Sequence, residues 1–352
     1  MKLMILSAFL QHLLFAFGLF LFSSILCWKI IQRSKIMDTP NHRSSHTKPT
    51  PTAGGLAIVT TFFLGMGILY FIADKTMITQ KFFLGFTFSS LLISGMSFYD
   101  DYKQKPFSLR LITQIIAILV VIAFGIVITN IDLSFSRNTS LGIWGYLITF
   151  VWILGLTNSY NFMDGLNGMA GGNAVITSLF LCIVSFNQGS NFTYIVCYTL
   201  IAGTLGFLIF NFPKGKLFMG DVGSTFLGFT FATLAIISSL YDKAHTSLLV
   251  IPLLLFHFIY DSFFTFIRRL FAKENVFQAH RTHLYQLLNR MGYSHTRVTL
   301  FYYAMATAQG LGVLWMVTIP DLERLLVFIP YLIFQIIYSI IVIILARKKN
   351  LL

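Results

Sequence analysis

The stretch Thr-Tyr-Ile-Val-Cys-Tyr-Thr-Leu-Ile-Ala-Gly-Thr-Leu-Gly-Phe-Leu-Ile-Phe-Asn-Phe, residues 193–212, contains no charged side chain. A helix rises about 1.5 Å per residue, so about 20 such residues cross the roughly 30 Å hydrocarbon core of a bilayer. Its apolar residues form a continuous run rather than an alternating pattern, which favours a helix over a β-strand. The stretch is therefore predicted to be a membrane-spanning helix.

Ten further segments are also long apolar runs. No internal sequence repeat, Pro/Ser-rich linker or low-complexity run divides the chain. Residues 1–352 are therefore predicted to form a single domain, an all-α polytopic integral membrane protein with about eleven transmembrane helices. The predicted spans are 8–31, 53–73, 82–99, 108–129, 143–157, 169–187, 193–212, 225–241, 248–267, 298–318 and 325–346.

Composition supports the same class. Of 352 residues, 56% are apolar and 11% are charged, whereas soluble proteins carry about 25% charged residues. This excludes a soluble enzyme, and it excludes a disordered or nucleic-acid-binding chain.

The net charge of +13 comes from 25 Lys and Arg against 12 Asp and Glu. Alternate loops divide the basic residues into 19 and 6, and the richer set is expected in the cytoplasm. An odd number of spans then places the N-terminus outside and the C-terminus in the cytoplasm.

Acidic residues gather at the predicted cytoplasmic ends of spans. Asp100 and Asp101 directly follow the third span, where two adjacent carboxylates repel each other unless a base or a cation offsets them. A solvated helix end balanced by Lys103 and Lys105 is the alternative.

Two glycine-rich segments carry further carboxylates. Asp164 lies in 157–172, a stretch with three Asn, four Gly and no base. Such a stretch suits a nucleotide or a diphosphate, although it could also be a flexible loop. Asp221 lies between two glycines just before the eighth predicted span, where it could cap a helix or face a metal ion.

Asp261 lies near the inner end of the ninth span, and a buried intramembrane Asp is functional by default. An ion pair with Arg268 is the alternative interpretation.

In the following loop, Arg281 and His283 could contact phosphates, while 284–291 has the apolar spacing of an amphipathic helix. Acidic and amide oxygens without clustered Cys or His favour Mg²⁺ over zinc. Together these features indicate a membrane enzyme that joins a soluble nucleotide to a lipid.

Six motifs in order resemble one family, the polyprenyl-phosphate N-acetylhexosamine-1-phosphate transferases of glycosyltransferase family 4. They cover most of the chain. The motifs are Asp-Thr-Pro-Asn-His-Arg (38–43), Lys-Pro-Thr-Pro-Thr-Ala-Gly-Gly (48–55), Asp100-Asp101, Asn-x-x-Asn-x-x-Asp-Gly (158–165), Phe-Met-Gly-Asp-x-Gly-Ser (218–224), and Asp261 with Arg268-Arg269.

The resemblance implies a reaction in which undecaprenyl phosphate attacks the β-phosphorus of a UDP-N-acetyl sugar and UMP leaves. It also implies Mg²⁺ as cofactor, with Mn²⁺ as a substitute, and a place in the bacterial cytoplasmic (inner) membrane among its lipids. A homodimer is a further partner that the sequence leaves open. The product would start a lipid-linked surface polysaccharide such as O-antigen or a cell-wall glycan.

The resemblance also implies roles for individual residues. Asp221 and Asn161 would ligate Mg²⁺. Asp100 would orient or deprotonate the acceptor phosphate, and Asp101 would support it. Asp164 and Asn167 would bind the nucleotide, and Lys48, Arg281 and His283 would bind phosphates or sugar. Asn158 and Asp261 are also implied to bind substrate.

Two departures narrow the branch of the family. Asn167 stands where many members have Asp, and only His283 remains of a His-x-His-His signature, since Tyr285 and Gln286 follow. This disfavours the muramoyl-pentapeptide branch and favours the O-antigen or capsule-initiating branch, with the sugar open among GlcNAc, GalNAc, FucNAc and QuiNAc. The alternatives from other classes are a secondary transporter of an anionic solute or lipid carrier, and a non-catalytic lipid-binding scaffold. A transporter would place its charges near the bilayer midplane.

Overall fold

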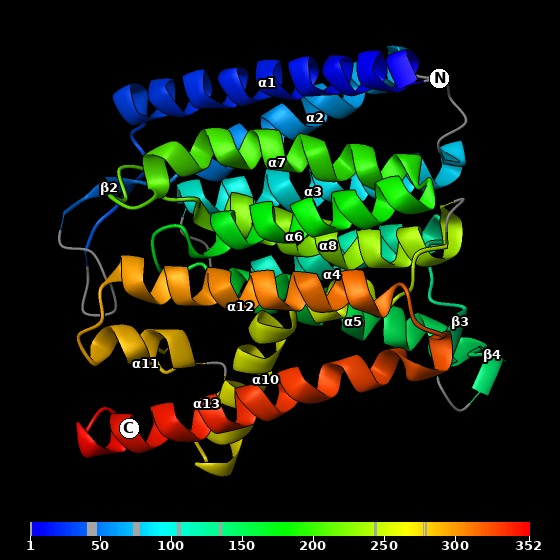
Figure 1. The fold of residues 1–352 in the computed structure, drawn as a ribbon. Helices are drawn as coiled ribbons and strands as arrows, with labels where there is room; N and C mark the ends of the chain where they lie inside the picture. The colour runs from blue at the N-terminus through cyan, green and yellow to red at the C-terminus, as the bar shows by residue number, and fades with distance from the viewer. Residues whose placement is uncertain are drawn as a thin grey trace.

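The computed structural model describes residues 2–40, 48–72, 78–103, 107–133, 136–242, 245–276, 278 and 280–352. Long helices run side by side in a bundle, and the two termini lie at opposite ends of it (Figure 1). The helices are α1 (Lys2–Arg33), α2 (Gly54–Ile72), α3 (Gln80–Lys103), α4 (Phe107–Ala123), α5 (Ile143–Phe162), α6 (Met169–Gln188), α7 (Asn191–Asn211), α8 (Gly220–Ile236), α9 (Val250–Leu254), α10 (Phe256–Phe271), α11 (Leu284–Arg290), α12 (His295–Met316) and α13 (Phe328–Lys348).

Within the described residues, seven helical segments are long and apolar enough to cross a membrane: α1, α2, α3, α6, α7, α8 with the π-helical turn at Ile237–Tyr241, and α13 with the 3₁₀ segment Asp321–Val327. The all-α polytopic class is therefore confirmed. The other four predicted spans also contain helices, but the count of eleven stays a prediction. The orientation of the termini also stays a prediction.

Two local expectations are wrong. Segment 248–267 is not one helix, because α9 and α10 meet at a break at Leu255. Helix α8 begins at Gly220, five residues before the predicted start, so Asp221 lies inside its first turn. Outside the predicted spans, two short antiparallel strand pairs connect helices: β1 (Met37–Asp38) with β2 (Thr50–Pro51), and β3 (Asn130–Leu133) with β4 (Ser136–Ser140).

Helix α8 is the core of the bundle, and nearly all of its side chains are buried. Its start is fixed by α2, because the amides of Gly54 and Gly55 donate to the carbonyls of Phe218 and Met219, at 2.9 and 2.7 Å. A Cβ atom on Gly55 would come within 2.3 Å of the nitrogen of Gly223, so the two backbones approach as only glycine allows. This contact sets the position of the turn that carries Asp221.

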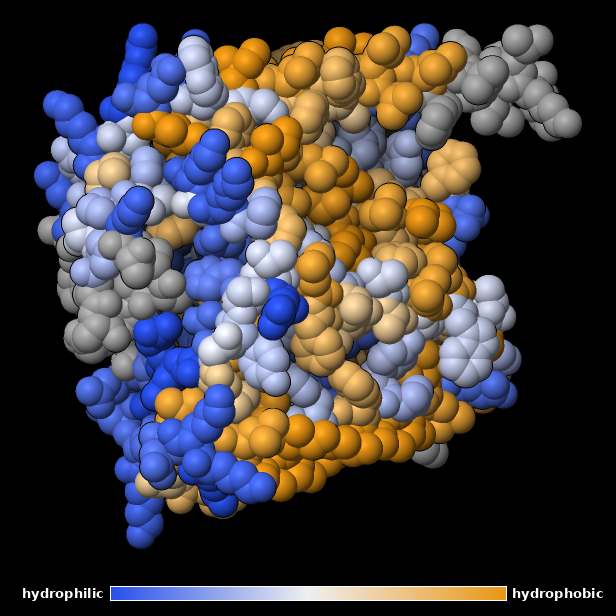
Figure 2. Space-filling model, turned by 60° about the vertical axis from the view of Figure 1, so that its left-hand side comes forward, coloured by the Kyte–Doolittle hydropathy of each residue, from blue (hydrophilic) through white to orange (hydrophobic). Residues whose placement is uncertain are grey.

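Polar and apolar surfaces are separated along the bundle. Hydrophilic side chains gather at the end that holds α11 and the C-terminus, while hydrophobic side chains cover much of the flank (Figure 2). The chain thus has one strongly polar end, as the uneven loop charges lead us to expect.

Candidate active site

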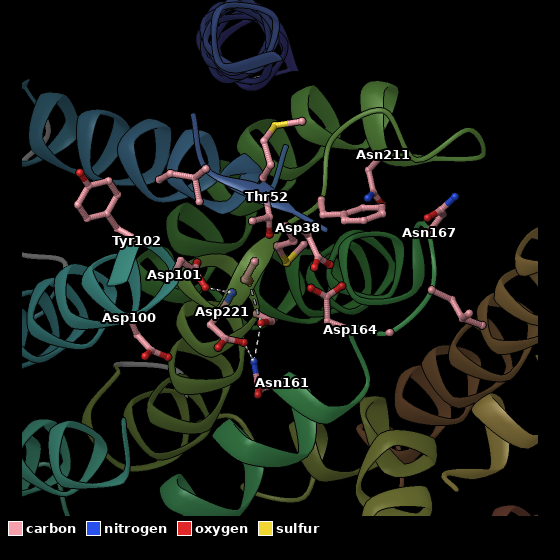
Figure 3. A pocket seen from close by; sticks show the side chains of 18 of the residues that line it. Asp38, Thr52, Asp100, Asp101, Tyr102, Asn161, Asp164, Asn167, Asn211 and Asp221 are labelled. Atoms are coloured by element: carbon pink, nitrogen blue, oxygen red, sulfur yellow. Dashed lines mark hydrogen bonds between the residues drawn. The ribbon is translucent and has the colours of Figure 1, made fainter. Parts of the chain in front are cut away.

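A cavity of about 650 Å³ lies at the polar end of the bundle. It is built where α3 and α5 end and where α4 and α8 begin, and the segment around α11 closes one side (Figure 3). Its walls are rich in carboxylates. The predicted site residues that line it are Asp100, Asp101, Asn161, Asp164, Asn167, Asp221 and Arg281.

Asp101 holds the first turn of α8. Its two carboxylate oxygens accept the backbone N–H groups of Asp221, at 3.1 Å, and Val222, at 3.0 Å. The first N–H groups of a helix have no partner within the helix, and the helix dipole favours a negative charge there. Asp101 therefore fixes the backbone that carries Asp221.

Gly220 makes this arrangement possible. Its φ of +73° lies in the left-handed region that favours glycine. A Cβ atom there would lie 2.7 Å from Oδ2 of Asp101 and 2.9 Å from the carbonyl oxygen of Thr52. Any other residue at this position would be strained and would push the Asp101 carboxylate off the helix start.

Asp221 is contacted from two sides. Its Oδ1 accepts a hydrogen bond of 2.8 Å from the Asn161 amide, which also donates to the Ser224 hydroxyl at 2.9 Å. Its Oδ2 lies 2.6 Å from an Nη atom of Arg110. The same Arg110 reaches Oδ2 of Asp100 through Nη, at 2.6 Å, and Nε, at 3.0 Å. One guanidinium thus bridges two carboxylates from different helices.

Arg110 is a site residue that the sequence alone does not single out, because it is one of the 19 bases in the richer set of loops. Its place in the first turn of an apolar helix, soon after the Asp100-Asp101 pair, is the signal that could have identified it. Asn211 is not singled out either. It lines the cavity, and its side-chain oxygen accepts the N–H of Gly168 at 2.6 Å, which holds the loop after α5.

Asp164 lies in that loop, half-buried, with its carboxylate turned into the cavity (Figure 3). Among the described residues, none donates a hydrogen bond to this carboxylate. Burial, and then the negative charges of Asp221 and Asp101, raise the pKa of Asp164 well above its usual range. A cation or a hydrogen-bonding ligand in the cavity would relieve this repulsion. Nearby, Asn167 donates to the carbonyl of Pro213 at 3.0 Å.

The oxygens of this cavity suit a magnesium site in which the protein supplies few of the ligands. In the described parts of the chain, no three Asp, Glu, His or Cys side chains stand close enough to hold a metal. Mg²⁺ typically uses one or two carboxylates and takes its other oxygens from water and phosphates. Asp221 supplies such a carboxylate. Asn161 presents its NH₂ group to Asp221 (Figure 3), so its oxygen would face a shared ion only after the amide turns over.

Asp261 does not line the cavity. Asp261 and Arg268 do not form the alternative ion pair, and an Nη atom of Arg268 donates instead to the carbonyl of Thr282. The buried Asp261 instead anchors α11. The groups that contact its carboxylate oxygens are the N–H of Leu284 (2.9 Å), the N–H of Tyr285 (3.3 Å), Nδ1 of His283 (3.2 Å), and the hydroxyls of Tyr302 (2.8 Å) and Thr265 (3.2 Å).

Three more predicted substrate contacts lie elsewhere. Lys48 is exposed, just before β2, and does not line the cavity. Asn158 pairs with the Gln114 amide at 2.7 Å, and His283 is buried against Asp261. Of the motif at 38–43, residues 41–43 lie outside the described residues. The predicted helix at 284–291 is confirmed as α11, but its apolar side packs against α13.

We expect Asp261→Asn to loosen α11. An amide would turn an NH₂ group toward backbone N–H groups that now face carboxylate oxygens, and a buried unsatisfied donor costs about 1–3 kcal/mol. Hydrogen exchange at the amides of Leu284 and Tyr285 should therefore speed up markedly. The exposed Asp321 serves as the matched control, and Asp321→Asn should leave these amides protected. Unchanged protection in Asp261→Asn would show that the carboxylate does not hold this helix.

The comparisons with known proteins agree with this picture. Residues 83–239 match the model of a family described as glycosyl transferase family 4. The chain is 29% identical to the "Probable undecaprenyl-phosphate N-acetylglucosaminyl 1-phosphate transferase" of Bacillus subtilis, over 82% of this chain and 80% of that one. It is 28% identical to the "Decaprenyl-phosphate N-acetylglucosaminephosphotransferase" of Mycobacterium leprae, over 80% and 77%. It is 25% identical to the "Undecaprenyl-phosphate alpha-N-acetylglucosaminyl 1-phosphate transferase" of Escherichia coli K12, over 84% and 82%.

Proposed function

Because this chain belongs to glycosyl transferase family 4, we propose that it transfers an N-acetylhexosamine-1-phosphate from a UDP-sugar to undecaprenyl phosphate and releases UMP. The names of its relatives specify an N-acetylglucosaminyl 1-phosphate group, so UDP-N-acetylglucosamine is the donor we expect. We further propose that the product starts a surface polysaccharide, O-antigen or cell-wall glycan, at the bacterial cytoplasmic membrane.

One observation supports this proposal most. The Asp221 carboxylate stands in the first turn of a buried helix, beside Asp100, Asp101 and Asp164, in a cavity at the polar end of a membrane bundle. A nucleotide can reach such a cavity from water, and a lipid phosphate can reach it from the flank. Clustered carboxylates repel a diphosphate unless a divalent cation lies between them, so the geometry favours a substrate that arrives with a cation.

The reaction needs positioning more than acid–base chemistry. An oxygen of the lipid phosphate forms a bond to the β-phosphorus, and the bond from that phosphorus to the oxygen bridging to the α-phosphate breaks. UMP leaves with the bridging oxygen. Since a phosphate monoester has its second pKa at about 6, the attacking oxygen is largely ionised at neutral pH without a protein base.

Individual roles follow the geometry. Asp221 and Asn161 would hold Mg²⁺ or its substitute Mn²⁺, which when bound neutralises charge on the diphosphate. Asp100 would orient the acceptor phosphate, and Asp101 would hold the turn of Asp221 in place. The residues proposed for substrate binding from the cavity wall are Asp164 and Asn167 at the nucleotide and Arg281 at phosphate.

The test is an assay of purified protein with Mg²⁺, undecaprenyl phosphate and a panel of UDP-GlcNAc, UDP-GalNAc, UDP-FucNAc and UDP-QuiNAc, with UMP release as readout. We expect release with UDP-GlcNAc and none after chelation of the metal. Absence of UMP with every sugar would overturn the proposal. Uptake of an anionic solute into vesicles without lipid turnover would favour the transporter alternative.

A further inference from the structure

Both oxygens of the Asp221 carboxylate are engaged by donors of the chain itself. Oδ1 accepts from Asn161 at 2.8 Å, and Oδ2 lies 2.6 Å from Arg110. The side chains of Asp221 and Arg110 are each 25% exposed, so solvent reaches the pair. A metal ion that uses Asp221 as a ligand must therefore share a carboxylate oxygen with one of these donors or displace that donor.

Arg110 is the stronger of the two obstacles. Its positive charge repels a cation that approaches the same carboxylate, whereas the neutral amide of Asn161 only has to turn. Arg110 also has a second partner, since it holds Asp100 through both Nε and Nη. It can therefore give up Asp221 without leaving its place in the cavity, because Asp100 retains it.

The carboxylates explain why such a base is needed. Five carboxylates line one cavity, and three bases accompany them: Asp38, Asp100, Asp101, Asp164 and Asp221, with Lys35, Arg110 and Arg281. Without a metal ion, the cavity therefore holds a surplus of negative charge. Arg110 contacts two of the five carboxylates directly.

We propose that Arg110 is a built-in competitor of the divalent cation. Its guanidinium takes the cation's place against Asp221 in the metal-free protein and yields this carboxylate when metal binds. The inference rests on the proposed function for the identity of the metal site. Arg110 would thereby weaken metal binding in the absence of substrate while it keeps the metal-free cavity in shape.

The test is metal binding without substrate, measured with Mn²⁺ by the loss of its free-ion paramagnetic resonance signal. We expect Arg110→Gln to bind Mn²⁺ about tenfold more tightly than the wild type, because the competing charge is gone. Arg110→Lys keeps the charge and should stay near the wild-type affinity. Arg297→Gln, which removes the same charge from an exposed residue outside the cavity, should leave the affinity unchanged.

The outcomes separate the two ideas. If Arg110→Gln binds Mn²⁺ no more tightly than Arg297→Gln, the competition does not exist. If neither the wild type nor Arg110→Gln binds Mn²⁺, the metal assignment and the competition both fall. If the affinities follow the expected order but no sugar gives UMP release, the proposed function fails while the competition stands. Asp221→Asn should remove binding in both backgrounds.

Discussion

Asp221→Asn should lower the rate of UMP release by about 10³-fold or more. The substitution keeps the size and shape of the side chain but removes the negative charge that would hold the cation and that pairs with Arg110 at 2.6 Å. Loss of a single electrostatic contact to a transition state commonly costs about 10²–10³-fold in rate. Here the lost group would also be a metal ligand, which places the effect at the upper end.

The matched control is Asp321→Asn. It is the same chemical change on an acid whose side chain is 64% exposed and paired with Arg324. Surface ion pairs contribute about 0–1 kcal/mol to stability, so turnover and folding should hardly change. Near-normal turnover in Asp221→Asn, with both proteins equally folded, would remove Asp221 from the catalytic machinery.

Gly220→Ala should reduce turnover by about 100-fold or more, because misplacement of a catalytic group by about 1 Å can cost that much. The new methyl group would lie 2.7 Å from Oδ2 of Asp101. It would force that carboxylate away from the N–H groups of Asp221 and Val222 and so re-aim Asp221. The measurement is kcat, with the circular-dichroism spectrum as a check that the helices remain.

Gly189→Ala is the control for Gly220→Ala. Gly189 has nearly the same φ, +76° against +73°, but a Cβ atom there meets nothing within 4 Å. It should carry only the cost of a left-handed non-glycine residue, about 1–2 kcal/mol. Equal loss of turnover in the two variants would mean that backbone strain, rather than the contact with Asp101, explains the effect.

The apolar runs predicted the helices well, because a span must be long and continuous whatever it packs against. The start of α8 was less predictable. The glycines at 220 and 223 read as helix breakers in sequence. In the fold, contact with Gly55 and capping by Asp101 stabilise a helix through them.

The site residues were likewise predictable from the sequence in part. Asp100, Asp101, Asp164 and Asp221 are recognisable because carboxylates at span ends are unusual in so apolar a chain, and they do share one cavity. The partner of Asp261 could not be foreseen. The choice between Arg268 and the backbone of α11, 23 residues away at Leu284, depends on how the loop folds back. The bridge by Arg110 between two helices is equally invisible in the order of the residues.

The most direct test of the central claim uses a UDP-N-acetylglucosamine labelled at its β-phosphorus. Purified protein, undecaprenyl phosphate and Mg²⁺ should move the label into the lipid fraction, with one UMP released for each labelled lipid formed. That result requires transfer of the sugar together with its phosphate. Label that stays in the water-soluble fraction as UDP, while the sugar alone passes to lipid, would contradict the account, as would the absence of any labelled lipid.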